Sequence, residues 1–214
     1  MSTASSKPAT PQRLRHAARR LAAVDVDWEW LIATVGPCRL QIHDLRSPYE
    51  ALVRAIAYQQ LHARAAEAIL GRLLALYPRS DFPSPRQLLR ADPQRQRDCG
   101  LSASKLAAIR GIAQGALDGV IPERAEADAL SDAELIARLT TLRGVGRWTV
   151  EMLLIFTLGR MDVLPVDDYG VREGYRRLKR LERAPTPRQL QALGEDWAPQ
   201  RSVAAWYLWR MPVI

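Results

Sequence analysis

Metal ligands and reactive thiols are scarce in this sequence, which contains only two cysteines and three histidines. Cys38 and Cys99 are too few to build a zinc or iron–sulfur site without several other ligands. His16, His43 and His62 show no spacing that is typical of a metal site. Two alternatives remain for these cysteines: a disulfide between them, or the state that is more usual in an intracellular chain, two buried thiols. We therefore expect chemistry that requires no metal ion or cofactor.

Long apolar runs are also absent. No stretch approaches the ~18 consecutive apolar residues that a membrane-spanning helix needs. The chain begins MSTASSKPATPQ, which is small and polar and lacks the apolar core of a signal peptide. We expect residues 1–14 to form a disordered tail, and the protein to be soluble and cytoplasmic with no membrane partner.

Positive charge and apolar residues are abundant. The formal net charge is +8, the isoelectric point is about 10.1 and 48% of the residues are hydrophobic. A pI above ~9 is typical of proteins that bind nucleic acid. Arginine far outnumbers lysine, and a GC-rich genome produces that preference without any functional cause. Charge therefore favours a nucleic-acid partner but does not decide the function.

Helical periodicity dominates the chain. Apolar residues recur at spacings of three and four in residues 52–57, 69–74, 106–113 and 135–139, and no segment alternates as a β-strand does. Most of the prolines fall between these segments. The sequence predicts an all-α protein of about ten helices.

A helical hairpin is the clearest local prediction. Ser131 and Glu134 have the spacing of a capping box, so a helix begins there and runs to about Thr140. In LRGVGRWTVE, residues 142–151, two glycines then turn the chain into an apolar helix that we expect to be deeply buried, with Gly159 after its end. Two readings of the glycine turn remain open: a tight corner that needs small residues, or a backbone that donates its amides to a phosphate.

Five stretches, taken together, resemble one family. They are LRGVGRWTVE, DVLPVDDYGVREGY after it, WAPQRSVAAWYLWR near the C-terminus, and RAIAYQQLHARAAEAIL and GLSASKLAAIRGIA upstream. In their order along the chain they are similar to the helix-hairpin-helix–Gly/Pro/Asp DNA glycosylase superfamily, in the branch of 3-methyladenine DNA glycosylase II and the yeast-type alkylbase glycosylases. The resemblance covers about residues 45–214.

The resemblance implies a fold and an activity. The fold is two helical subdomains with a helix-hairpin-helix motif at residues 131–158 and a DNA-binding cleft between them. We expect residues 15–45 and 161–214 to form one subdomain and residues 46–160 the other. The implied enzyme is a monofunctional glycosylase that acts on double-stranded DNA with alkylated bases such as 3-methyladenine and 7-methylguanine, as a monomer, in the nucleoid of a bacterium.

The resemblance also assigns the reacting residues. Asp168 is the implied catalytic carboxylate, and Asp167 is the expected helix cap, although either aspartate suits a cap. The implied base pocket comprises Trp148, Trp209, Met152 and Tyr58. Family members that also cleave the strand carry a Schiff-base lysine at the position of Trp148, so this chain should only release bases. Trp206 is expected to lie in the core, and packing against it is the alternative for Trp209.

DNA contacts follow from the same resemblance. Gln60 is the expected wedge that fills the gap left by an extruded base, beside Gln59, Leu61 and His62, while an ordinary helix end is the alternative. The implied phosphate contacts are Arg143, Gly144, Val145, Gly146, Arg147, Lys105, Arg201 and Ser202. A structural Na⁺ or K⁺ held by the carbonyls of Thr140, Leu142 and Val145 is also implied.

Two departures from the pattern limit these expectations. Met152 stands where the bacterial enzyme has a pocket tyrosine, which leaves the breadth of substrates open. Residues 1–44 are too short and too helical for that enzyme's N-terminal sheet domain, so the compact yeast-type architecture is the closer one. The alternatives are a glycosylase for hypoxanthine or an ethenoadduct, and a non-catalytic protein that keeps the hairpin for DNA binding; Asp168 and the two tryptophans favour an enzyme.

Overall fold

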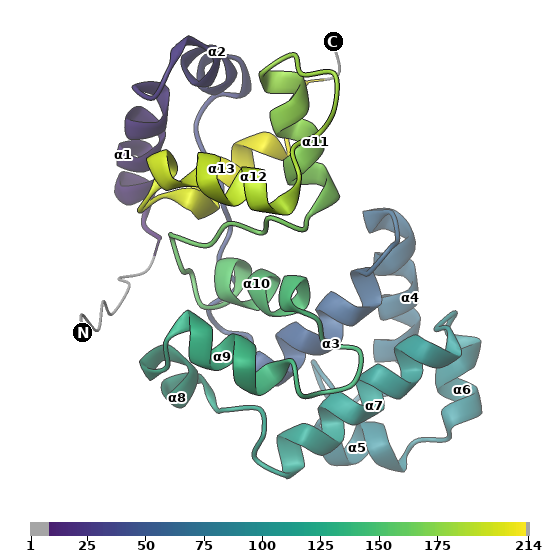
Figure 1. Ribbon diagram of the computed structural model, residues 1–214. Coiled ribbons are helices and arrows are strands. Elements are labelled where there is room, and N and C mark those ends of the chain that lie inside the picture. Colours follow the sequence, from purple (N-terminus) through teal and green to yellow (C-terminus); the bar gives the residue numbers. More distant parts are fainter. Residues whose placement is uncertain (1–8, 213–214) are drawn as a thin grey trace. The chain divides into compact units, whose positions relative to one another are not determined.

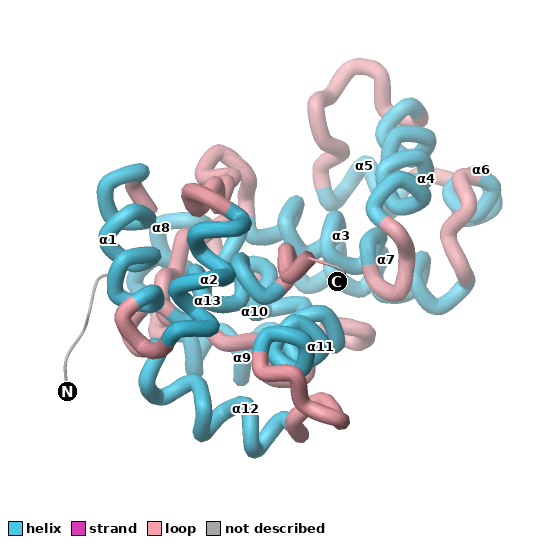
Figure 2. The backbone as a smooth tube through the Cα atoms, turned by 90° about the horizontal axis from the view of Figure 1, so that it is seen from above, coloured by secondary structure: helices cyan, strands magenta, loops and turns pink. Residues whose placement is uncertain are grey.

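The computed structural model describes residues 9–212, and these fold entirely into helices and loops (Figures 1 and 2). The all-α prediction is therefore confirmed for the described part of the chain. Thirteen α-helices and one 3₁₀ helix are found there, more than the sequence predicted. The additional helices are short, because α5, α6 and α8 have six residues each and α12 has seven, too few for a clear apolar period.

The helices follow one another with short connections. Their bounds are α1 Pro11–Ala22, α2 Val26–Val35, α3 Pro48–Tyr58, α4 Ala63–Ala75, α5 Pro85–Arg90, α6 Pro93–Asp98, α7 Ala103–Leu117, α8 Arg124–Ala129, α9 Asp132–Leu139, α10 Arg147–Phe156, α11 Tyr169–Leu178, α12 Pro187–Leu193, η1 Gly194–Trp197 and α13 Arg201–Leu208. None of the described helices is long and apolar enough to pass through a membrane.

The start of α1 corrects the expected disordered tail. Thr10 caps this helix by accepting a hydrogen bond from the amide of Arg13, and Pro11 occupies its first turn, where its missing N–H costs nothing. Residues 11–14 are therefore helical, and Leu14 is buried. The first eight residues of the expected tail lie outside the described part.

The described chain forms two compact units. Unit 1 comprises residues 44–153, and unit 2 comprises residues 9–43 with 154–212. The sequence placed the second boundary at residue 160, but it falls inside α10, between Leu153 and Leu154. A continuous apolar helix gives no compositional signal for such a division.

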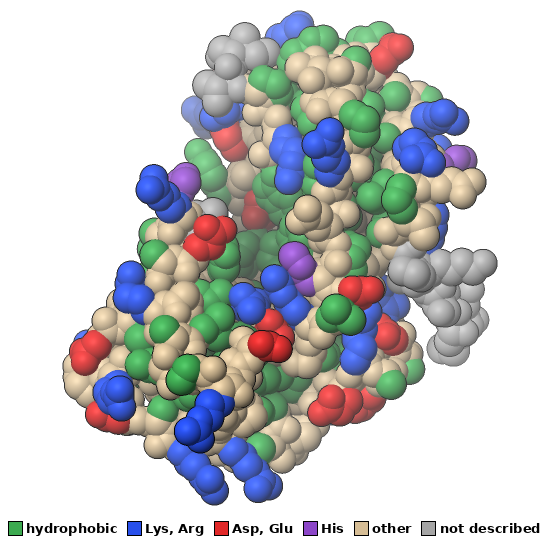
Figure 3. All heavy atoms as spheres, turned by 180° about the vertical axis from the view of Figure 1, so that it is seen from behind, with side chains coloured by type: hydrophobic (Ala, Val, Ile, Leu, Met, Phe, Trp, Pro, Cys, Tyr) green, Lys and Arg blue, Asp and Glu red, His purple; other side chains and the backbone are tan. Residues whose placement is uncertain are grey.

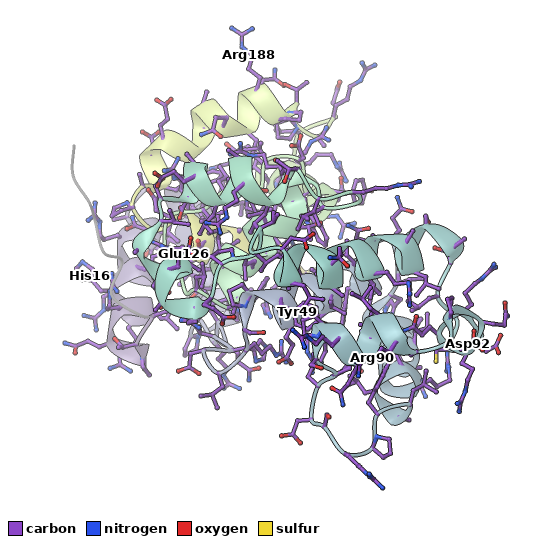
Figure 4. All side chains as sticks on the ribbon, turned by 90° about the horizontal axis from the view of Figure 1, so that it is seen from below. His16, Tyr49, Arg90, Asp92, Glu126 and Arg188 are labelled. Carbon is purple, nitrogen blue, oxygen red and sulfur yellow. The ribbon has the colours of Figure 1, made fainter. Side chains whose placement is uncertain are left out.

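Unit 1 is organised around α7, which packs against α3, α5 and α6. Leu52 and Ile56 of α3 and Ile109 and Ile112 of α7 are fully buried in its core. Tyr49 at the start of α3 also lies within this unit (Figure 4), and its hydroxyl donates to the carbonyl of Pro83.

Unit 2 joins the two ends of the chain, with α1 packed on α2 and α11 packed on α13. Its core contains Trp28 edge-on to Trp197, with ring centroids 5.2 Å apart. The backbones of α11 and α13 approach closely, because a Cβ on Gly174 would lie 2.2 Å from the carbonyl oxygen of Leu208. This contact fixes how the first turn of α11 faces the end of α13.

Candidate active site and DNA-contact elements

The hairpin forms as the sequence predicts. Ser131 and Glu134 make both hydrogen bonds of the capping box at the start of α9. Gly144 has φ +84°, and a Cβ there would lie 2.6 Å from the Cβ of Ala108 on α7, so this glycine is required by the turn itself. Most of α10 is buried, and Gly159 follows it with φ +68°.

Gly146 is a different case from Gly144. It is exposed, its φ is not in the left-handed region, and a Cβ built on it would meet nothing within 4 Å. The protein's own packing therefore does not require glycine here. A glycine that the fold does not need, at the start of α10, leaves room for an external group to approach the backbone amides.

Basic side chains flank this turn. Arg143 is exposed. Arg147 donates from Nε to Oε1 of Glu151 at 2.8 Å, and the arginine side chain is 55% exposed while that of Glu151 is 1% exposed. The buried carboxylate thus orients a guanidinium whose other end reaches solvent.

Two residues that were expected to contact phosphate instead bind other groups of the protein. The Ser202 side chain is fully buried, where its hydroxyl accepts from the amide of Val163 and donates to the carbonyl of Arg160, so the expectation for Ser202 is wrong. Arg201 forms a bidentate ion pair with Asp162, with both N–O distances 2.7 Å. Both residues tie α13 to the loop that follows α10.

Lys105 also has structural partners. Its ammonium donates to the carbonyl of Ala57 at 2.9 Å and to that of Gln59 at 2.7 Å. Burial lowers the pKa of Lys105 below its usual range. This lysine therefore caps the C-terminal end of α3 rather than projecting freely toward a phosphate.

The expected wedge residues form the turn between α3 and α4. Gln60, Leu61 and His62 are exposed, and Gln60 has φ +55°, which is strained for a residue with a side chain. Gln59, by contrast, is tied to the hairpin. Its side-chain amide Nε2 donates to Thr149 Oγ1 at 3.0 Å and to the backbone carbonyl of Gly144 at 3.3 Å. Gln59 thus joins this turn to the hairpin, and Gln60 is left at the tip.

Asp168 is itself the N-cap of α11, which corrects the assignment of that role to Asp167. Its Oδ1 accepts from the amide of Val171 at 2.8 Å, and Asp167 is exposed one residue earlier. The same Oδ1 also accepts from the indole Nε1 of Trp209 at 2.9 Å. The structure thereby brings two of the expected site residues into direct contact.

Phe156 completes this cluster and was missed by the sequence analysis. Its ring stacks on Trp209 with centroids 5.7 Å apart and an interplanar angle of 27°. The signal was available, because Trp148, Met152 and Phe156 recur every four residues along α10 and all three are half-buried. Trp206 lies in the core as expected, beneath the guanidinium of Arg210. The stacking partner of Trp209 is therefore Phe156, not Trp206.

The remaining expected pocket residues belong to unit 1. Trp148, Met152 and Tyr58 are all half-buried there, whereas Asp168, Trp209 and Phe156 belong to unit 2. Phe156 also lines a cavity of about 600 Å³ within unit 2, whose other lining residues are Val35, Pro37, Arg39, Gln41, His43, Trp206 and Arg210.

Nucleophilic thiol chemistry has no support in the structure. Both cysteines are free, which leaves no disulfide between them. Burial raises the pKa of Cys38 to about 11 and also raises the pKa of Cys99, so both are thiols at neutral pH. Among the described residues, no three His, Cys, Asp or Glu side chains are grouped as metal ligands.

The family follows from comparison with known sequences. Residues 53–200 match the family described as the HhH-GPD superfamily base excision DNA repair protein. The chain belongs to this superfamily. This superfamily member is 45% identical over 191 residues to DNA-3-methyladenine glycosylase 1 of Schizosaccharomyces pombe, covering 89% of the chain and 84% of the relative. It is 30% identical to DNA-3-methyladenine glycosylase 2 of Escherichia coli, covering 75% of the chain and 56% of that relative.

Solved structures of the superfamily agree with this fold. The S. pombe 3-methyladenine DNA glycosylase in complex with abasic DNA matches with a TM-score of 0.85 and 44% identity, covering 91% of this chain and 95% of that one. A DNA-3-methyladenine glycosidase from Bacillus halodurans matches with a TM-score of 0.77 and 32% identity, covering 91% and 88%.

Proposed function

We propose that the protein is a monofunctional DNA glycosylase that hydrolyses the N-glycosidic bond of alkylated purines, such as 3-methyladenine and 7-methylguanine, in base excision repair. The observation that carries the proposal is the anchored carboxylate of Asp168 at the head of α11, held by the amide of Val171 and the indole of Trp209. Phosphate binding alone requires no such group. The names of the relatives support the same activity.

The chemistry requires the damaged nucleotide to leave the duplex, because the reacting bond is inaccessible within the stack. Gln60, exposed at the tip of the α3–α4 turn, would fill the gap from the minor groove. The amides of the hairpin turn, with Arg143 and Arg147, would hold the phosphate backbone.

Bond cleavage then depends on charge. As the N-glycosidic bond breaks, its electron pair leaves with the base and the sugar becomes oxocarbenium-like. The carboxylate of Asp168 would stabilise that positive charge and orient a water, which adds to the anomeric carbon and loses a proton. An alkylated purine is already cationic and departs readily. Trp148, with Met152 and Tyr58 beside it as the proposed base pocket, would offer a π face to this cation.

The backbone carbonyls of the hairpin could also hold a monovalent cation, which would have a structural and not a catalytic role. The carbonyl of Leu142 accepts the amide of Val145 and keeps a second lone pair. With the carbonyls of Thr140 and Val145 it would suit Na⁺ or K⁺, which would stiffen the turn. We further infer that the enzyme needs no other cofactor and acts as a monomer on chromosomal DNA, which in a bacterium lies in the nucleoid.

Base release from methylated duplex DNA tests the activity. Chromatography of the released material should give 3-methyladenine and 7-methylguanine and leave intact abasic sites. Duplexes with hypoxanthine or ethenoadenine, run in parallel, test the other lesions. Release of no base from any of them would leave only DNA binding by the hairpin.

The monofunctional assignment has its own measurement. Because Trp148 has no amine, sodium borohydride should trap no covalent adduct between the enzyme and the DNA during the reaction. A trapped adduct would refute the assignment.

A further inference from the structure

The hydrogen bond from Trp209 to Asp168 gives the tryptophan a role distinct from base stacking. Two donors meet one atom, because Trp209 Nε1 lies 2.9 Å and the Val171 amide 2.8 Å from Oδ1 of Asp168. We propose that Trp209 is a positioning residue, which holds the carboxylate of Asp168 in its reacting orientation. The inference rests on the proposed glycosylase function.

The capping bond alone would not fix the carboxylate. The last torsion of an aspartate side chain is broad, so a single bond from Val171 leaves the plane of the carboxylate free to turn about it. A second donor on the same oxygen, from another helix, removes that freedom. Hydrogen bonds to an ionised acceptor are also stronger than neutral ones. Oδ1 therefore serves as the anchor of this carboxylate.

Trp209 can act as a fixed donor because its own ring is held in place. Phe156 stacks on one side of the indole at a centroid distance of 5.7 Å. Trp209 directly follows α13, and its amide still bonds to the carbonyl of Ala205. The close approach of Gly174 to Leu208 sets the separation of α11 and α13 just before this point. The donor and the acceptor are thus both attached to packed helices.

Gly170 supplies independent support. A Cβ on this residue would lie 2.9 Å from Cδ1 of Trp209 and 3.1 Å from Oδ1 of Asp168. The first turn of α11 therefore carries a glycine where the indole must reach past it to the carboxylate. Its φ is not in the left-handed region, so the helix itself does not require glycine here.

The first test removes only the indole donor. Trp209→Phe keeps an aromatic ring against Phe156 but has no N–H. Single-turnover release of 7-methylguanine from methylated duplex should fall by about tenfold to a hundredfold, while affinity for a duplex with a tetrahydrofuran abasic analogue should be unchanged. Trp206→Phe is the matched control: it removes an indole three residues earlier, within α13, and its rate should match the wild type.

A double-mutant cycle distinguishes positioning from other roles. If Trp209 acts through Asp168, Trp209→Phe should cost much less in an Asp168→Asn background than in the wild type. Equal losses in the two backgrounds would overturn the proposal, because a residue that stacks on the base or merely packs would act regardless of the carboxylate.

Gly170→Ala covers the case in which Trp209→Phe misfolds. Alanine suits a helix but forces the indole and the carboxylate apart, so excision should fall while the melting temperature and DNA affinity are retained. Wild-type excision by both Trp209→Phe and Gly170→Ala would refute the positioning role. An inactive wild-type enzyme would instead refute the glycosylase proposal itself.

Discussion

At the scale of single residues, one aspartate combines a structural role with a proposed chemical role. Asp168 caps α11 through Val171 and is the proposed catalytic carboxylate. Asparagine is a comparably good cap, so Asp168→Asn should cost at most about 1 kcal/mol of folding free energy. It removes the charge that opposes the oxocarbenium ion, and the excision rate should fall by about 10²–10³. Single-turnover excision with melting curves measures both effects.

Asp167→Asn is the control for this prediction. Asp167 is exposed and does not cap the helix, so its variant should keep both the stability and the rate of the wild type. A dead Asp167→Asn enzyme, or an Asp168→Asn enzyme with wild-type excision, would contradict the catalytic assignment.

The residue scale also shows where sequence reasoning ends. The motif located Asp168, but two adjacent carboxylates are equal candidates for a cap until the path of the backbone is known. Arg201 and Ser202 match a family motif, yet a motif does not tell whether a side chain faces a ligand or the interior; Ser202 is buried. Phe156 follows Trp148 and Met152 at a spacing of four, but within a helix that is apolar on nearly every face this spacing does not distinguish it from an ordinary core residue.

At the scale of elements, the two turns proposed to contact DNA are joined within unit 1. Gln59 connects the α3–α4 turn to the hairpin through Gly144 and Thr149. Lys105 holds the same turn through two backbone carbonyls. A phosphate gripped at the hairpin would therefore fix the register of Gln60 as well. The capping box made α9 predictable from local sequence, whereas these ties join residues about 50 to 90 positions apart and no local pattern reveals them.

Substitutions of two neighbouring glutamines should affect different properties, one the stability of the protein and the other base release. Gln59→Ala removes both hydrogen bonds to the hairpin and should lower the unfolding free energy by about 1–2 kcal/mol, with weaker DNA binding. Gln60→Gly relieves the strain of φ +55° and should leave stability unchanged or higher, but base release should fall because the wedge is gone. Chemical denaturation and single-turnover excision distinguish the two. A Gln60→Gly enzyme with full excision would show that another residue fills the gap.

At the scale of the whole molecule, the question is how the net positive charge is distributed over the surface. The chain carries +8, and several of its arginines are already neutralised by carboxylates, as in the pairs Arg54–Glu50, Arg176–Glu173 and Arg201–Asp162. On the face drawn in Figure 3, basic side chains are spread among acidic ones rather than gathered in a single block. Binding should therefore depend on particular phosphate contacts and not on total charge alone.

Salt dependence tests this expectation. Binding to undamaged duplexes of different sequence should be equally strong and should weaken steeply with salt, because each phosphate contact contributes a slope of about −0.9 to a plot of log K against log salt concentration. Arg143→Ala at the hairpin should reduce that slope by about one. Arg188→Ala is the matched control: this arginine extends away from α12 (Figure 4) and carries the same charge. If both variants change the slope equally, total charge and not the hairpin governs binding; if affinity is the same at low and high salt, the phosphate contacts proposed for the hairpin do not form.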